Sequence, residues 1–172
     1  WSSDVCSSDL PEPRINLGLL LLELGRAQEA SEQFEAAGAR DPSDFRAPLG
    51  QAKAMAQLGD ARGSRDLAQR AITLLSDPNK PTTTERVFRQ AQAHDLAQSD
   101  QRAVELYTLA MNVDPTRIAS CEHAIGRILL RQGQERAAAE RFARTIKADP
   151  GGAMEAMCDL AWIATAARDA SL

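Results

Sequence analysis

The sequence predicts an all-α fold, an α-solenoid in which antiparallel helix pairs stack along the chain. The main observation is a short pattern that four stretches repeat. In its clearest form it reads Leu-Gly-x-x-Leu, a Gly, Ala-x-x-x-Phe-x-x-Ala and Asp-Pro. The first copy begins at Leu17 and the clearest later copy at Ile125, an offset of 108 residues that every matching pair keeps. This offset is close to three steps of a helix–turn–helix repeat of about 34 residues.

The composition also favours helices. The chain has 172 residues, with 44% hydrophobic but only 4% aromatic side chains, because alanine and leucine are abundant. Such a composition suits closely packed helices better than a sheet core, which would need more β-branched and aromatic residues. No apolar run approaches the roughly 18 residues of a membrane span, so we expect no membrane insertion.

Residues 1–10 lie outside the helical pattern. Their sequence, WSSDVCSSDL, resembles the in-frame translation of a common sequencing adapter. We expect this segment to be non-native and the natural N-terminus to be missing; a disordered serine-rich terminus is the alternative. Localisation therefore stays open.

Without that segment the chain carries 22 acidic and 20 basic side chains, a net charge of −2. A nearly neutral surface gives no electrostatic reason to bind nucleic acid. Cys121 and Cys158 remain as isolated cysteines, which we interpret as small buried apolar residues.

Helical periodicity runs from residue 11 to the end. The predicted helices lie at about 13–24, 28–40, 45–58, 62–76, 84–97, 101–113, 119–132, 136–148 and 153–168. Four of the short links contain a proline, which cannot continue a helix: Pro42, Pro78, Pro115 and Pro150.

Three links inside the helix pairs begin with a glycine, which can adopt the left-handed conformation after a helix: Gly25, Gly59 and Gly133. Residues 82–85, Thr-Thr-Thr-Glu, have the form of a capping box that opens the fifth helix. Small residues recur where the two helices of a pair approach, and large ones, such as Phe34 and Phe142, follow a turn later to fill the space between layers.

These residues resemble the tetratricopeptide repeat family, whose pattern is W-x2-L-G-x2-Y, A-x3-F and P. The resemblance covers residues 11–172, with repeats at about 11–44, 45–80, 84–117 and 119–152 and a partial repeat at 153–172. Repeats one and four follow the pattern most closely. They depart from it at the tryptophan place, which holds Arg14 in the first repeat and Glu122 in the fourth.

The resemblance implies a protein–protein interaction module, a scaffold that presents a concave groove to a peptide or protein and has no catalysis, cofactor or metal of its own. The alternative is the non-catalytic region of a larger enzyme, such as a glycosyltransferase or sulfotransferase. The pentatricopeptide RNA-binding array has a similar period, but it needs a basic groove.

The resemblance also implies that the first helix of each pair lines the groove. Carried onto this chain, the groove positions give the partner-binding candidates Leu49, Lys53, Gln57, Phe88, Gln92, His123, Arg127 and Arg131. The polar members could hold an extended peptide through amide and charge-assisted hydrogen bonds, and Leu49 and Phe88 could supply apolar contact. Alternatively, these are ordinary solvent-facing side chains. The carboxylate clamp of the chaperone-binding members is absent, because Ile15 and Leu19 stand in its places.

No catalytic or metal-binding motif is present, and the two histidines, His94 and His123, lie on different repeats without metal-ligand spacing. The last predicted helix, 153–168, is apolar at Met154, Met157, Leu160, Trp162 and Ile163. One neighbour cannot cover so much apolar surface, so we expect the array to continue beyond Leu172; an ordinary capping helix is the alternative.

Overall fold

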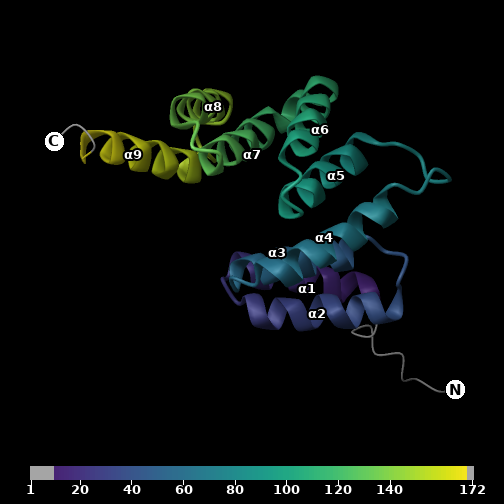
Figure 1. The fold of residues 1–172 in the computed structure, drawn as a ribbon. Coiled ribbons are helices and arrows are strands. Elements are labelled where there is room, and N and C mark those ends of the chain that lie inside the picture. Colours follow the sequence, from purple (N-terminus) through teal and green to yellow (C-terminus); the bar gives the residue numbers. More distant parts are fainter. Residues whose placement is uncertain (1–9, 170–172) are drawn as a thin grey trace, which may run out of the picture. The chain divides into compact units, whose positions relative to one another are not determined.

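The computed structural model describes residues 10–169, and within this range the chain forms nine α-helices, one short 3-10 helix and no strand (Figure 1). Their bounds are α1 Pro11–Glu23, α2 Ala27–Arg40, α3 Arg46–Gln57, α4 Ala61–Leu75, α5 Thr84–Leu96, α6 Asp100–Val113, η2 Pro115–Arg117, α7 Ile118–Arg131, α8 Glu135–Ala148 and α9 Met154–Asp169. The prediction of an all-α helical repeat is confirmed, and each helix lies within two residues of its predicted bounds. The proposed adapter segment falls almost entirely outside the described residues.

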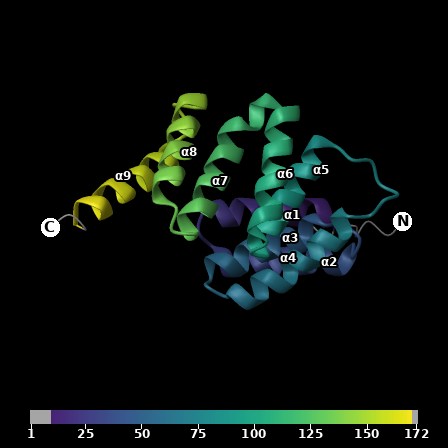
Figure 2. The same cartoon turned by 45° about the horizontal axis from the view of Figure 1, so that its top comes forward.

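The described chain divides into two compact units that share α5. Unit 1 contains residues 10–81 and 92–99, and unit 2 contains residues 82–91 and 100–169. In unit 1, helices α1 to α4 pack side by side (Figure 1). In unit 2, α6, α7 and α8 follow one another in the same way (Figure 2). Short links between helices produce this arrangement, since they leave each helix beside the one before it.

An aromatic ring fills the space between layers in each unit. Phe34 of α2 is 1% exposed and lies against two glycines, Gly18 of α1 and Gly50 of α3. A Cβ atom added to either glycine would lie within 3.0 Å of the ring. Phe142 of α8 is 0% exposed and meets Gly126 of α7 in the same way. The predicted alternation of small and large residues is therefore confirmed at these positions.

Polar contacts occupy the place where two repeats lack the usual tryptophan. Glu122 is buried there, and the Nη1 atom of Arg141 lies 2.9 Å from its carboxylate. In the first repeat, Arg14 donates to the side chain of Gln33 over 3.3 Å. Both pairs join the first helix of a repeat to the same place on the second. A polar pair thus joins the two helices of the repeat at this place in both repeats.

Four links inside the helix pairs contain a residue in the left-handed conformation. Gly25, Gly59 and Gly133 have φ values of 72°, 81° and 74°, as the sequence predicts. The fourth residue is Gln98, with φ 58°, in the link between α5 and α6. A side chain at such a φ costs about 1–2 kcal/mol relative to glycine, because its Cβ approaches the carbonyl oxygen.

We therefore expect Gln98→Gly to raise the free energy of unfolding by about 0.5–1 kcal/mol. Glycine removes the steric cost in the folded state, but part of this gain is lost because glycine also makes the unfolded chain more flexible. The opposite exchange, Gly59→Gln, should lower it by about 1 kcal/mol. Urea denaturation followed by far-UV circular dichroism measures both. A loss of stability in Gln98→Gly would contradict the strain at this link.

The aspartate of each Asp-Pro link closes a turn, whereas the sequence analysis considered only the proline, as a residue that cannot continue a helix. Asp41 Oδ1 accepts the backbone N–H of Ser43 at 3.0 Å, and Asp114 Oδ1 accepts that of Thr116 at 3.1 Å. Asp149 accepts the N–H of Gly152 at 2.9 Å. Such aspartate turns are local, since the side chain satisfies a backbone group two or three residues ahead.

These bonds stabilise the charged carboxylate. Hydrogen bonds from the hydroxyl and the backbone of Ser43 hold the pKa of Asp41 below its ordinary value. The stabilisation is therefore present above the unfolded pKa of about 3.9 and is lost as the pH falls through the lower folded value. We expect Ser43→Ala to raise the pKa of Asp41 in a carboxyl NMR titration and to leave that of Asp114 unchanged. Equal pKa values for Asp41 in both proteins would contradict this account.

Two local predictions need correction. Thr83, not Thr82, caps α5, because its hydroxyl accepts the backbone N–H of Arg86 at 3.2 Å. Cys121 is fully buried as predicted, and burial raises the pKa of its thiol to about 11, so the thiol is protonated at neutral pH. Cys158 is exposed, and the prediction that it is buried was wrong. It lies on a face of α9 that α8 does not cover.

Helix α9 buries one side against α8. Ala153, Ala156 and Ile163 are 3%, 1% and 8% exposed and pack with Phe142. The large apolar residues on its other side are exposed, namely Met154, Met157 and Trp162. The packing therefore buries Ile163 and partly buries Leu160, but it leaves Met154, Met157 and Trp162 exposed.

Candidate functional site

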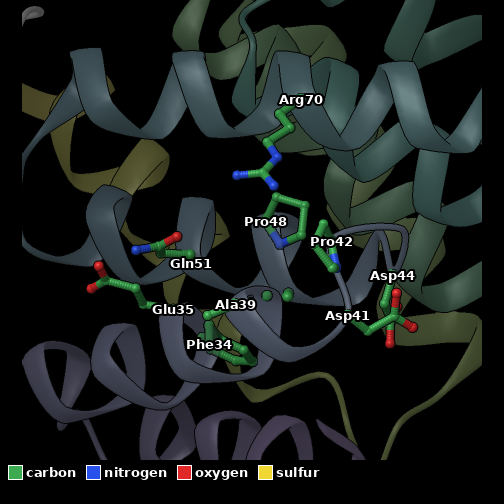
Figure 3. Close-up of a pocket in the computed structure, with 11 residues that line it drawn as sticks. Phe34, Glu35, Ala39, Asp41, Pro42, Asp44, Pro48, Gln51 and Arg70 are labelled. Atoms are coloured by element: carbon green, nitrogen blue, oxygen red, sulfur yellow. The ribbon is translucent and has the colours of Figure 1, made fainter.

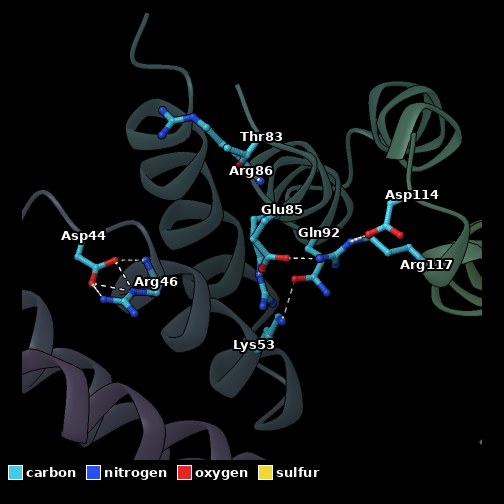
Figure 4. A network of polar contacts seen from close by, with 10 residues as sticks. Asp44, Arg46, Lys53, Thr83, Glu85, Arg86, Gln92, Asp114 and Arg117 are labelled. Atoms are coloured by element: carbon cyan, nitrogen blue, oxygen red, sulfur yellow. Dashed lines mark hydrogen bonds and ion pairs between the residues drawn. The ribbon is translucent and has the colours of Figure 1, made fainter. Parts of the chain in front are cut away.

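The polar candidates of unit 1 lie on α3 and on the C-terminal part of α5. The Nζ atom of Lys53 lies 3.1 Å from Oε1 of Gln92, so these two candidates are in contact (Figure 4). Gln57 is exposed one turn further along α3, and its Nε2 lies 3.5 Å from the carbonyl oxygen of Leu22. The structure thus brings an ammonium group and two amides to one part of unit 1.

The apolar candidate of unit 1 is in the core. Leu49 is 3% exposed and packs with Ala71, Ile72 and Leu75 of α4 and with Ala93 of α5. The sequence analysis predicted that Leu49 makes apolar contact with a partner. Its side chain instead fills the space between successive helices.

Phe88, the apolar candidate of unit 2, is also buried. It is 8% exposed, its ring meets Tyr107 edge-on at 5.8 Å, and the guanidinium of Arg117 lies 4.7 Å above the ring. A cation over an aromatic face is attracted by the ring electrons. Phe88 therefore anchors the link before α7 to α5 and leaves little surface for a partner.

His123 on α7 is largely covered by α9. Its Nε2 lies 3.1 Å from Oδ2 of Asp159, and its Nδ1 lies 3.8 Å from a carboxylate oxygen of Glu155. The ring also lies 5.6 Å from that of Phe142. The structure places α9 where the sequence analysis expected a partner to touch this histidine.

The two arginines of α7 differ in their surroundings. Arg131 reaches the N-terminus of α6, where its Nη2 lies 2.5 Å from Oδ1 of Asp100. Gln132 donates to the other oxygen of Asp100 at 2.8 Å. Arg127 is exposed one turn earlier. Arg127 is therefore the candidate of α7 whose guanidinium is presented to solvent, whereas Arg131 also holds two helices together.

A similar ion-pair arrangement occurs at the start of α3 and in η2, just before α7. In unit 1, Nη1 of Arg46 lies 2.7 Å from Glu12 of α1, and Nη2 lies 2.8 Å from Asp44. In unit 2, Arg117 contacts Glu85 of α5, and its Nε lies 3.1 Å from Asp114 (Figure 4). Each arginine thus joins the aspartate of a link to a glutamate about one repeat earlier.

The charges in these pairs lower the pKa of both glutamates. Hydrogen bonding and the charge of Arg46 lower the pKa of Glu12. Burial alone would raise the pKa of Glu85, but Arg89 and Arg117 lower it below its ordinary value. The sequence analysis missed these pairs, although a Glu and an Arg roughly one period apart are visible in the sequence.

A surface cavity of about 330 Å³ lies in unit 1 between α2, the following link and α3. Pro42, Pro48 and Ala47 form much of its apolar wall, and Arg70 of α4 extends over Pro48 (Figure 3). The carboxylates of Asp41 and Asp44 at its edge are held by the link itself. None of the residues predicted to bind a partner lines this cavity.

The described residues do not form a metal centre: between residues 10 and 169, no three or more His, Cys, Asp or Glu side chains are grouped so that they could hold an ion. In the same range no helix has the length and apolar character to cross a membrane.

Comparison with known families identifies the repeat. Residues 15–81 and 123–171, more than half of the chain, match the sequence model of the tetratricopeptide repeat. The chain belongs to the tetratricopeptide repeat family. The matched ranges cover most of repeats one and four, which follow the pattern most closely. Among curated proteins, none matches this chain.

Solved structures of tetratricopeptide repeat and related proteins share the fold. In the crystal structure of the APC/C hetero-tetramer Cut9–Hcn1, the matching chain is 15% identical, with a TM-score of 0.64 over 90% of this chain and 30% of that one. PilF of Pseudomonas aeruginosa is 17% identical, with a TM-score of 0.61 over 92% and 69%. YrrB, described as a tetratricopeptide repeat protein with an unusual peptide-binding site, is 17% identical, with a TM-score of 0.50 over 91% and 77%. At these identities the likeness concerns the fold alone.

The tetratricopeptide repeat fold makes this chain a repeat scaffold. Of the eight predicted site residues, the structure buries Leu49 and Phe88, covers His123 with α9 and pairs Arg131 with Asp100. Lys53 and Gln92 are in contact on unit 1, and Gln57 and Arg127 are exposed. The buried and paired members were not distinguishable in the sequence, because their exposure depends on how the next helix packs.

Proposed function

We propose that this tetratricopeptide repeat chain binds a peptide or protein segment through polar side chains on its first helices and has no catalysis of its own. The observation that carries the proposal is the exposure of Arg127 on α7, whose opposite side packs into the core at Ile125 and Ile128. A guanidinium held on a rigid helix can donate charge-assisted hydrogen bonds to a carboxylate. Lys53, Gln57 and Gln92 offer an ammonium group and amides on unit 1.

On unit 1 taken by itself, Lys53, Gln57 and Gln92 suit an extended segment with acidic side chains, since the ammonium group can pair with a carboxylate and the amides can bond to the backbone. YrrB, a tetratricopeptide repeat protein described as having a peptide-binding site, agrees with this class of ligand. Leu49 and Phe88 are not part of the proposed surface, because both are buried.

The test is a selection of random displayed peptides on the immobilised full chain. We expect acidic binders whose affinity falls about tenfold in Arg127→Glu, because reversing the charge removes an ion pair and adds repulsion. The matched control is Arg136→Glu, the same exchange at an exposed position on α8. Binding that Arg127→Glu and Arg136→Glu weaken equally, or no selected binder at all, would reject this site. Circular dichroism should show unchanged helix content in both variants.

A further inference from the structure

Two contacts fix how α1 lies against α3 in unit 1. Near the starts of the two helices, Nη1 of Arg46 lies 2.7 Å from Oε1 of Glu12. Near their ends, Nε2 of Gln57 lies 3.5 Å from the carbonyl oxygen of Leu22. The residues of these two pairs are 34 and 35 positions apart in the chain. The helices therefore run in the same direction and keep a nearly constant register along their length.

This register places Leu19 of α1 beside Lys53 of α3, because the same interval separates them as separates Glu12 from Arg46. Lys53 in turn contacts α5, where its Nζ lies 3.1 Å from Oε1 of Gln92 (Figure 4). Leu19 is 40% exposed, and neither Lys53 nor Gln92 is buried. Leu19, Lys53 and Gln92 thus form a row across three first helices of unit 1, which we call the leucine–lysine row.

The exposure of Leu19 does not depend on where the described chain begins. Its counterparts in the next three repeats are Lys53, Gln92 and Arg127, and none of these is buried although a repeat precedes each of them. The stacking of one repeat on the next therefore leaves this position open. A large apolar side chain stands here in the first repeat, where the later repeats have polar ones.

The surface beside Leu19 on α3 also has an apolar part. Ala56 is exposed one turn after Lys53 on the same face of the helix. The stem of a lysine side chain can lie along apolar surface while its ammonium group stays in water. Leu19, Ala56 and this stem can therefore contact an apolar side chain of a ligand, next to a cation that attracts a carboxylate.

We propose that the leucine–lysine row binds an extended segment of another protein in which a large apolar side chain lies about three positions from a carboxylate. Packed helices lie about 8–10 Å apart, and an extended chain advances about 3.3 Å per residue. A segment that crosses from Leu19 to Lys53 therefore advances by about three residues. The carboxylate is the one that the proposed function assigns to Lys53, so this inference rests on that function and adds a neighbouring apolar contact.

The probe is a displayed library of short peptides with one fixed aspartate and random residues elsewhere, selected on the immobilised full chain. A second library, with serine in place of the aspartate, is the reference. We expect more binders from the aspartate library, and we expect them to carry a large apolar residue about three positions from the aspartate. The affinity of a selected peptide, measured by fluorescence anisotropy, should fall about tenfold in Leu19→Ser, because the contact with one apolar side chain is lost.

The matched control is Leu20→Ser, the same exchange at the next residue of α1. Leu20 is 52% exposed, but it points about 100° away around the helix. This variant should bind the selected peptide like the unchanged chain. Lys53→Glu should weaken binding at least about tenfold, because it replaces attraction of the aspartate by repulsion. Circular dichroism should show the same helix content in all three variants.

Aspartate binders without an apolar preference at this spacing would overturn the inference and leave the proposed function intact. Equal losses in Leu19→Ser and Leu20→Ser would do the same, since the contact would then not be specific to Leu19. Binders that Lys53→Glu leaves unaffected would also overturn it, because they bind elsewhere on the chain. An aspartate library that yields no more binders than the serine library would instead reject the proposed binding of acidic segments by unit 1.

Discussion

Replacing Phe34 with alanine is expected to lower the free energy of unfolding of unit 1 by about 3–5 kcal/mol, the range for removing a buried aromatic ring. The ring lies between Gly18 of α1 and Gly50 of α3, so its loss leaves a space bordered by two different helices. Backbone atoms close to the ring cannot easily move in to fill that space. Urea denaturation gives the change, and hydrogen exchange of the amides of α1 to α4 assigns it to unit 1.

A second exchange at Gly50 tests the same contact. In the unchanged chain, Gly50→Ala should destabilise by about 1–3 kcal/mol, because its Cβ would lie within 3.0 Å of the ring. In the Phe34→Ala background the same exchange should stabilise by up to about 1 kcal/mol, since alanine favours the helix and fills part of the space. Additive effects of the two exchanges would show that Phe34 does not fill the gap above Gly50.

Replacing Arg141 with alanine is expected to cost about 2–3 kcal/mol of stability, because it leaves the buried carboxylate of Glu122 without its close partner. The side chain of Glu122 is 7% exposed, and that of Arg144 lies further away, at 3.7 Å. Arg141 itself is 28% exposed, so solvent screens part of the pair and we place the cost below that of a fully buried bridge.

The double variant Glu122→Leu with Arg141→Leu should recover most of that loss, because two apolar side chains of similar size need no charge partner. Glu122→Leu alone, Arg141→Leu alone and this double variant form, with the unchanged chain, a double-mutant cycle measured by urea denaturation. If the double variant is as unstable as Arg141→Ala, the cost arises from lost packing of the arginine stem rather than from the uncompensated charge.

Local signals in the sequence were sufficient to predict the helices. Glycine at Gly25, Gly59 and Gly133 and proline in the links act on the backbone within a few residues, so their effect does not depend on the rest of the fold. Gln98 has the same conformation without a glycine, and nothing in its residue type indicates this. In the link between α5 and α6, the packing of the surrounding helices therefore sets the backbone conformation, and not the residue type.

The surface was harder to predict than the fold. Leu49 and Phe88 occupy positions that can face either a groove or the next helix, and the rotation of each helix decides between them. The pair of Glu122 and Arg141 joins two helices across 19 residues, and neither residue alone indicates it. A pattern along one helix reports which residues share a face, but the packing of its neighbours decides what that face meets.

The aspartate turns have a consequence for how quickly the chain can fold. The bonds of Asp41, Asp114 and Asp149 join residues only two or three positions apart, so each turn can form before any contact between repeats exists. Contacts between neighbours in the chain require little loop closure, and proteins rich in them fold fast. Each link can therefore start the pairing of its own two helices, and folding can begin at more than one point along the chain.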